Sequence, residues 1–348
     1  MDSVREANGT AVAAGHRDHH KSTSSDYYFD SYSHFGIHEE MLKDKVRTQT
    51  YMNSIVKNPH LFEGKIVLDV GCGTGILSMF AARAGAAHVI AVDCAAIADQ
   101  ARIIVKQNKL SDRITVLRGK VEEIQLPNGI EKVDIIISEW MGYFLLYESM
   151  LDTVIYARDK WLKPGGLMFP DRANLYICSI EDAQYKAEKI QFWDNVYGFD
   201  MSCIREMALT EPLVDIVEPD FVNSDFQPIL SIDLCRVTKE ELDFESDFEL
   251  NSTRKDYVHA LVCFFDVEFS ACDGRIGFST GPFDKYTHWK QTVFYLDRDL
   301  VVNDGDVIRG SIKVNRNERN PRDIDILLRT SHDGSRGQIN QQRLYRLR

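Results

Sequence analysis

Residues 65–170 alternate between short apolar runs, as expected of buried strands, and longer segments with helical spacing. The pattern predicts strands at 66–70, 89–93, 114–117, 133–138 and 167–170, helices at 75–84, 95–108 and 147–161, and a turn at 164–166. Strands that alternate with helices in this way are typical of a doubly wound parallel sheet.

Beyond Pro170 the pattern changes to short β-rich runs that Gly, Asn and Asp residues separate. The expected strands are 174–180, 229–234, 258–269, 291–296, 307–314 and 324–328, and one helix is expected at 183–192. Many short strands between turn residues are typical of an all-β barrel or sandwich. We therefore predict one domain over 26–170 and a second over 171–348.

The N-terminal region has two parts with different expectations. Residues 1–25 are small and polar and include three clustered histidines. A metal site is one interpretation of these histidines, but a disordered tail is the one that the composition favours. The segment 39–47 has helical spacing, so Met41, Asp44 and Arg47 are predicted to share one helix face.

Composition limits the classes of partner. The chain has 348 residues and a net charge of −12, which disfavours nucleic acid as the main partner and favours a basic substrate. Its seven cysteines include no Cys-x-x-Cys pair, so neither a disulfide framework nor a zinc site is expected. Reduced thiols of this kind fit the cytosol or nucleus, and no signal peptide or membrane-spanning run is apparent.

A glycine-rich loop follows the first predicted strand. Asp69 lies at the end of that strand, and Gly71, Gly73 and Gly75 come after it, where a tight turn can bring the backbone close to a ligand. The dinucleotide pattern requires its third glycine one residue later, at a position that Ile76 occupies. A nucleoside ligand such as S-adenosylmethionine is therefore favoured over NAD.

Three more polar residues are candidates for contacts to such a ligand. Asp93 ends the second predicted strand, where a carboxylate can accept both ribose hydroxyls. Glu122 can accept from an adenine amino group, although a solvated loop acid fits its spacing nearly as well. Arg47 can pair with a ligand carboxylate or can be a surface charge of its helix.

Two glutamates follow the strand predicted at 133–138. Glu139 comes directly after it, and Glu148 stands nine residues on, past Gly142, so that a hairpin can bring the two side chains face to face. Two ionised carboxylates repel each other unless a cation lies between them. A planar guanidinium matches such a pair best. The spacing therefore predicts an arginine-binding slot.

Taken together, these features make the chain resemble the protein arginine methyltransferases, and among them the type I members most closely. The similarity runs from about Asp26 to the C-terminus with few gaps. The motifs that carry it are Tyr28-Phe29-Asp30-Ser31-Tyr32, His34 to Asp44, Val70 to Gly75, Ser138 to Tyr143 with Glu148, and Thr287-His288-Trp289.

The resemblance implies a Rossmann-like methyltransferase domain whose first helices, within 26–50, cover the cofactor. It also implies a β-barrel domain with a helical dimerisation arm at about 183–215. Cofactor-binding residues for S-adenosylmethionine would be His38, Arg47, Asp69, Gly71, Gly73, Gly75, Asp93, Val121 and Glu122. One departure is Asp93, which replaces the family's usual glutamate with a side chain one methylene shorter.

For the reaction, the resemblance implies that Glu139 and Glu148 hold the substrate guanidinium and that His288 lies beside Asp44. The residues that shape the substrate slot would be Tyr32, Met41, Met150 and Trp289. The implied products are monomethyl and asymmetric dimethylarginine in histone tails and Gly-Arg-rich proteins. The implied assembly is a homodimer or higher oligomer in nucleus and cytoplasm, without direct contact to nucleic acid or membrane and without a metal.

Three other functions are weighed against this one. The first is a methyltransferase for nucleic acid or small molecules. Enzymes that act on nucleic-acid amino groups tend to carry an Asn/Asp-Pro-Pro-aromatic segment, whereas this chain has Ser138-Glu139-Trp140-Met141 at that place. A non-catalytic adaptor with the same fold is expected to lack one of the two glutamates, and both are present. A dinucleotide oxidoreductase is disfavoured by Ile76.

Overall fold

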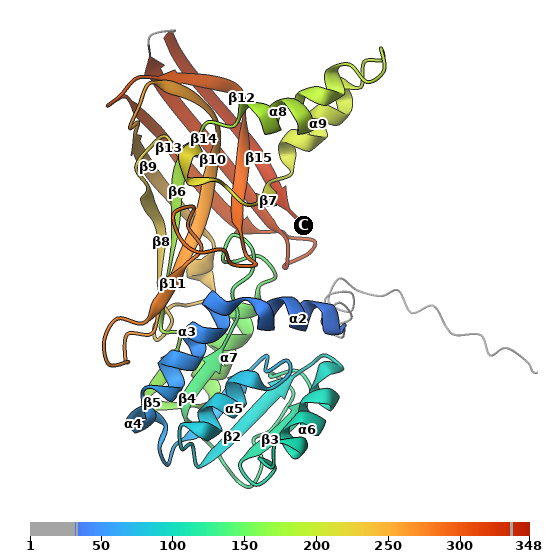
Figure 1. The fold of residues 1–348 in the computed structure, drawn as a ribbon, viewed down its shortest axis with the longest axis vertical. Coiled ribbons are helices and arrows are strands. Elements are labelled where there is room, and N and C mark those ends of the chain that lie inside the picture. Colours follow the sequence, from blue (N-terminus) through green and yellow to red (C-terminus); the bar gives the residue numbers. More distant parts are fainter. Residues whose placement is uncertain (1–31, 33, 335–336) are drawn as a thin grey trace, which may run out of the picture.

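A computed structural model describes residues 32, 34–334 and 337–348 (Figure 1). The predicted tail at 1–25 and most of the aromatic run after it lie outside the described residues. Two domains follow each other along the chain, and the segment between the strands that end at Phe169 and begin at Arg172 joins them. Among the described residues, no helix is long and apolar enough to span a bilayer.

The first domain is built on a five-stranded sheet in the order β3-β2-β1-β4-β5, in which all neighbours are parallel. This confirms the doubly wound parallel sheet predicted from the alternating pattern and the Rossmann-like domain that the resemblance implies. Its strands are β1 (Ile66–Val70), β2 (His88–Asp93), β3 (Ile114–Arg118), β4 (Val133–Ser138) and β5 (Leu162–Phe169). Its helices are α2 (Phe35–Lys43), α3 (Lys45–Val56), α4 (Pro59–Phe62), α5 (Ile76–Arg83), α6 (Ile97–Gln107) and α7 (Met150–Trp161).

The strand order locates the ligand crevice. β1 lies at the centre and is almost wholly buried, with β2 on one side and β4 on the other. The chain leaves β1 towards β2 but returns to β4 on the opposite side, so the loops at the carboxyl ends of β1 and β4 diverge and leave a crevice. The glycine loop and Glu139 follow these two strands directly.

Two local predictions in this domain are wrong. The predicted helix at 39–47 is broken at Asp44, whose backbone is extended (ψ 97°) and whose side chain accepts from the Arg47 backbone N–H to cap α3. A capping carboxylate competes with continued helix in this way. The predicted turn at 164–166 is an irregularity inside β5 instead, where the register with β4 shifts and Gly165 takes a φ of 73°.

The second domain consists of two antiparallel sheets that form a barrel-like body (Figure 1). One sheet has the order β7-β12-β10-β6-β8, with β11 paired to β10, and the other has the order β15-β14-β13-β9. The strands are β6 (Arg172–Ile180), β7 (Leu213–Asp215), β8 (Gln227–Asp233), β9 (Phe244–Asn251), β10 (Asp256–Glu268), β11 (Gly277–Ser279), β12 (Gln291–Val302), β13 (Val307–Arg316), β14 (Ile324–Gly334) and β15 (Gly337–Leu347).

A helical arm projects from the barrel (Figure 1). It comprises α8 (Ala183–Lys189), η1 (Gln191–Asp194) and α9 (Ser202–Thr210). Its root is tied to the barrel, because the buried Lys186 donates to the Leu296 carbonyl and to Asp299, each at 2.6 Å. Two short 3-10 segments, η2 (Pro219–Phe221) and η3 (Glu240–Leu242), connect other strands of the domain.

Candidate active site

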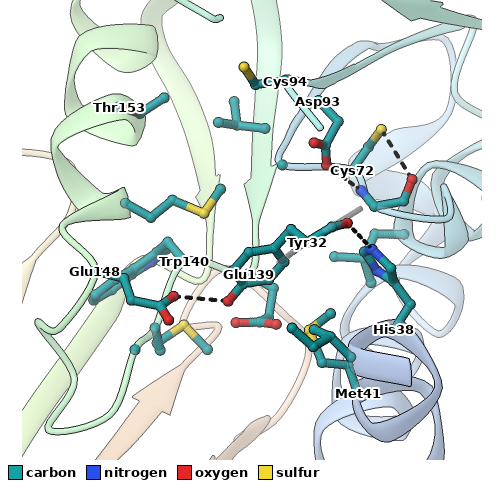
Figure 2. A pocket seen from close by; sticks show the side chains of 18 of the residues that line it. Tyr32, His38, Met41, Cys72, Asp93, Cys94, Glu139, Trp140, Glu148 and Thr153 are labelled. Carbon is teal, nitrogen blue, oxygen red and sulfur yellow. Dashed lines mark hydrogen bonds between the residues drawn. The ribbon is translucent and has the colours of Figure 1, made fainter. Parts of the chain in front are cut away.

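A cavity of about 490 Å³ lies at the carboxyl ends of β1, β2 and β4, and both α2 and the loop that carries His288 contribute to its wall. Figure 2 shows part of its lining. Most of the predicted site residues line it. They are Tyr32, His38, Met41, Arg47, Gly71, Gly73, Asp93, Val121, Glu122, Glu139, Glu148, Met150, His288 and Trp289. Asp44, Asp69 and Gly75 do not lie on its wall.

The glycine loop needs its glycines for two reasons. Gly71 and Gly73 have φ angles of 74° and 53°, a region that L-residues rarely adopt. A Cβ at Gly71 would lie 2.2 Å from Met150 Cε, and one at Gly73 would lie 3.2 Å from His38 Nδ1. The bare backbone therefore leaves room for Met150 and His38 at the cavity wall.

Asp93 is held rigidly at the end of β2. Its Oδ2 accepts from the Gly73 N–H and its Oδ1 from the Ala95 N–H, both at 2.8 Å. Burial raises the pKa of Asp93, and these backbone hydrogen bonds oppose the rise. Each oxygen keeps a further lone pair, so the carboxylate can still accept from neighbouring ligand hydroxyls.

Asp69 lies beneath the glycine loop, fully buried. Its Oδ2 accepts from Ser78 Oγ at 2.6 Å, while its Oδ1 has no hydrogen-bond partner among the described residues. Burial raises the pKa of Asp69 to about 7. Because Asp69 is buried and does not line the cavity, its position suits a role in supporting the glycine loop.

The acid predicted for the adenine end lies on the cavity wall next to buried Val121. Glu122 Oε1 accepts from Thr153 Oγ1 of α7 at 3.1 Å, so this side chain is oriented by a second element. An oriented acceptor of this kind can take the exocyclic amino group of a purine.

Glu139 already faces a guanidinium. Arg47 Nε donates to Glu139 Oε2 at 2.9 Å, and the two side chains are only 7% and 8% exposed. Arg47 Nη1 also donates to the Met41 carbonyl at 3.3 Å. Arg47, predicted to hold a ligand carboxylate, therefore joins the cofactor side of the cavity to the glutamate side.

Glu148 follows a tight hairpin that turns the chain back after Glu139. Gly142 N–H donates to the Leu145 carbonyl at 3.0 Å to close this hairpin. Tyr32 Oη donates to Glu148 Oε2 at 2.9 Å, and Figure 2 shows the Tyr32 side chain crossing the cavity towards the two glutamates. The Tyr32 carbonyl lies 2.8 Å from His38 Nε2, which fixes the other end of this residue.

The second domain contributes two of the predicted residues. His288 Nδ1 lies 2.8 Å from Asp44 Oδ2, and the His288 N–H donates to the same oxygen at 2.9 Å. Burial acts to raise the pKa of Asp44, but the hydrogen bonds from His288 and Arg47 hold it below its ordinary value. Trp289 Nε1 donates to the Met141 carbonyl at 2.8 Å and thereby fixes the hairpin.

Several cavity residues were not predicted. They are Thr74, Cys94, Lys120, Trp140, Tyr143, Thr153 and Arg322, among others on the wall. Cys94 directly follows the strand predicted at 89–93, and Lys120 lies three residues after the strand predicted at 114–117, so their places in the chain contained a signal. Arg322 lies in a polar turn far along the sequence, and only the packing of the two domains brings it to the cavity.

These residues fit S-adenosylmethionine as the cofactor. The glycine backbone permits close approach, Asp93 suits ribose hydroxyls, Glu122 suits an adenine amino group and Arg47 suits a carboxylate. Among the described residues, no group of three His, Cys, Asp or Glu side chains is placed to hold a metal ion.

Comparisons with known proteins agree with this geometry. Residues 67–166 match the model of a methyltransferase domain, and residues 171–335 match that of the arginine methyltransferase oligomerization subdomain. Protein arginine N-methyltransferase 1 of Chlamydomonas reinhardtii is 58% identical over 100% of this chain and 99% of its own length. Its Schizosaccharomyces pombe namesake is 63% identical over 87% of this chain and 89% of its own.

Solved structures of arginine methyltransferases also match this chain. The Trypanosoma brucei PRMT1 enzyme–prozyme heterotetrameric complex with AdoHcy matches with a TM-score of 0.89 and 49% identity, over 92% of this chain and 100% of that one. Arabidopsis thaliana protein arginine methyltransferase 10 matches with a TM-score of 0.82 and 32% identity, over 92% and 100%. The chain therefore belongs to the protein arginine N-methyltransferase family, as a type I enzyme that uses S-adenosylmethionine.

Proposed function

We propose that this enzyme methylates arginine in histone tails and Gly-Arg-rich proteins, giving monomethyl and then asymmetric dimethylarginine. The observation that supports this most directly is the pair of carboxylates, Glu139 and Glu148, on one cavity wall. Glu139 is already oriented towards a guanidinium, that of Arg47. A second guanidinium can enter between the two glutamates once the Tyr32 hydroxyl turns away from Glu148.

The slot formed by Glu139 and Glu148 would activate its guest by polarisation. A guanidinium is a poor nucleophile because it stays protonated and its lone pairs are delocalised. Two carboxylates draw its positive charge towards the nitrogens that they contact and leave the remaining terminal nitrogen richer in electrons. They also fix that nitrogen in one orientation, which removes much of the entropic cost of reaction.

The cofactor side of the cavity would supply the other reactant. S-adenosylmethionine, when bound, carries its methyl group on a positively charged sulfonium, which makes the methyl electrophilic. Arg47 would hold the methionyl carboxylate while it remains beside Glu139. Asp93 and Glu122 would hold the ribose and the adenine, and the glycine loop would exclude water from beneath.

His288, paired with Asp44, is one candidate to take the proton that the substrate nitrogen loses. The ionised Asp44 stabilises a positive charge on the imidazole 2.8 Å away. Glu139 and water are the competing acceptors for the same proton.

Product type would follow from crowding around the slot. Met41 of α2, Met150 of α7 and Tyr32 all line the cavity. Flexible but bulky side chains of this kind leave room for methyl groups on one nitrogen and restrict access to the other. Asymmetric dimethylation is the outcome that this arrangement supports.

We further propose a homodimer, formed through the arm, that works in nucleus and cytoplasm. The oligomerization subdomain matched at 171–335 includes the arm, which supports assembly. The net charge of −12 supports attraction of basic, arginine-rich chains at low salt.

The substitution Glu148→Gln tests the slot. It keeps the shape of the side chain but removes the charge, so methyl transfer to a Gly-Arg-rich peptide should fall by at least about 100-fold. Binding of S-adenosylmethionine, measured by calorimetry, should remain. Glu123→Gln, an exposed acid on the loop after β3, is the matched control and should retain the parent rate.

Mass spectrometry of the methylated peptide decides the product. Asymmetric dimethylarginine supports the assignment, and symmetric dimethylarginine contradicts it. A Glu148→Gln enzyme as active as the Glu123→Gln enzyme would show that the slot is not the site of activation.

A further inference from the structure

A turn of the second domain contacts the backbone of Glu148. The turn, residues 317–323, joins β13 to β14. The Glu148 N–H donates to the Arg322 carbonyl at 3.0 Å, and Arg322 Nη1 donates back to the Glu148 carbonyl at 2.8 Å. Both backbone groups of one predicted catalytic residue are thus held by a single arginine.

Neighbouring contacts reinforce this attachment. Ser149 Oγ donates to the Pro321 carbonyl. One helical turn further on, Arg316 Nη1 donates to Asp152 Oδ2 of α7 at 3.1 Å. The two residues before α7, Glu148 and Ser149, and Asp152 in its first turn are therefore all held to the β13–β14 hairpin.

The backbone at Glu148 requires such support. Glu148 and Ser149 have φ angles of 76° and 56°, in the left-handed region that is disfavoured for residues with a side chain. Conformations of this kind persist where surrounding contacts determine them. The rotation of this backbone sets the direction of the Glu148 carboxylate, so a change here would move the carboxylate away from Glu139.

The turn at 317–323 is held in one conformation by hydrogen bonds between its own residues. Asn317 Oδ1 accepts from the N–H groups of Arg319 and Asn320 at 2.9 and 3.1 Å. Asn320 Nδ2 donates to Asp323 Oδ1 at 2.7 Å, and the Asn317 N–H donates to the Asp323 carbonyl at 3.0 Å. These bonds fix the backbone of the turn and thereby the position from which Arg322 contacts Glu148.

We propose that Arg322 is a positioning residue for methyl transfer, which orients the Glu148 carboxylate from the second domain. This rests on the proposed role of Glu148 in the slot. Arg322 acts through the Glu148 backbone, and its own side chain lies on the cavity wall. The barrel domain is then required for the geometry of the slot as well as for covering it.

The test is Arg322→Gln, with Arg319→Gln as its control on the same turn, where Arg319 is exposed. Steady-state rates are measured with a Gly-Arg-rich peptide, cofactor affinity by calorimetry, and thermal stability by a melting curve. Arg322→Gln should lower kcat by about 10- to 100-fold, because a small misplacement of a reacting group has effects of this size. KM for the peptide, cofactor affinity and melting temperature should stay close to those of Arg319→Gln.

Arg322→Lys distinguishes positioning from simple support of the fold. An ammonium can still donate to the Glu148 carbonyl, so this variant should recover part of the lost kcat. A kcat of Arg322→Gln equal to that of Arg319→Gln would overturn the inference. A loss of kcat matched by losses in cofactor affinity and melting temperature would also overturn it.

The two variants test the proposed slot and the proposed role of Arg322 separately. If Glu148→Gln abolishes transfer while Arg322→Gln matches its control, the inference on Arg322 is wrong and the slot stands. If Glu148→Gln retains the full rate, the slot is wrong and the role of Arg322 falls with it.

Discussion

The charge of Asp69 depends on its burial. Burial raises the pKa of this carboxyl to about 7, and only one of its oxygens has a hydrogen-bond partner among the described residues. The folded chain therefore holds a proton on Asp69 up to about pH 7, whereas the unfolded chain releases it near pH 4. Because the folded state binds more protons between these values, the free energy of unfolding falls as the pH rises through that window.

Asp69→Asn should remove this pH dependence. The amide stays neutral and its oxygen can still accept from Ser78, so the free energy of unfolding of the variant should not fall through this window, and its advantage over the parent should grow between pH 5 and pH 8. By pH 8 the parent contains a buried charge, and the difference in favour of the variant should have grown by at least about 1.4 kcal/mol, the equivalent of one pKa unit. Urea unfolding of the cofactor-free proteins at both pH values measures this. An equal difference at pH 5 and pH 8 would show that Asp69 does not titrate in this range.

At the scale of elements, the hairpin between Glu139 and Glu148 shows what local sequence can and cannot predict. The apolar run of β4 and the glycine at 142 were enough to predict the strand, the turn and two acids at one site, and both acids line the cavity. The helix predicted from residue 147 begins only at Met150. The left-handed backbone at Glu148 was not predictable, because contacts from the turn at 317–323, far along the chain, determine it.

The same division holds for other elements. The parallel sheet followed from periodicity, because buried strands are apolar throughout. The break at Asp44 depends on a capping hydrogen bond that spacing alone does not reveal. β9 and β15 were missed, and in β15 the exposed Gln, Asn and Arg residues hide the apolar positions, of which Tyr345 and Leu347 are buried.

Gly142→Ala should disrupt the hairpin specifically. A Cβ there would lie 1.9 Å from the Tyr147 carbonyl oxygen, a backbone atom that cannot move without displacing Glu148. We expect kcat to fall by about 100-fold while S-adenosylmethionine still binds, because the glycine loop is untouched. Gly36→Ala, in α2 with nothing within 4 Å of the added carbon, is the matched control. Equal rates for the two variants in the peptide assay would contradict the prediction.

At the scale of the whole molecule, the active site is shared between the two domains. The first domain contributes the glycine loop and both glutamates, and the second contributes His288, Trp289 and Arg322. The second domain also carries the arm, whose far end exposes large apolar side chains. Tyr197 is 98% exposed and Phe199 is 69% exposed, an arrangement typical of a surface that another chain covers.

Replacing both of these aromatic residues should therefore separate the subunits. In the variant Tyr197→Ser/Phe199→Ser, sedimentation should report a monomer, where the proposed assembly predicts a dimer for the parent. Methylation of a Gly-Arg-rich peptide should fall because the subunits separate. The contact between Lys186 of α8 and Asp299, which holds the arm root, involves neither substituted residue and should keep its structure.

Phe226→Ser is the matched control for this experiment. Phe226 is also an exposed aromatic residue, but it lies just before β8 on the barrel and packs on Tyr176 and Phe264 rather than on the arm. This variant should remain a dimer, even if the loss of aromatic packing lowers its melting temperature. A dimer with unchanged activity in the arm variant would show that assembly uses another surface. A fully active monomer would show instead that assembly is not required for methyl transfer.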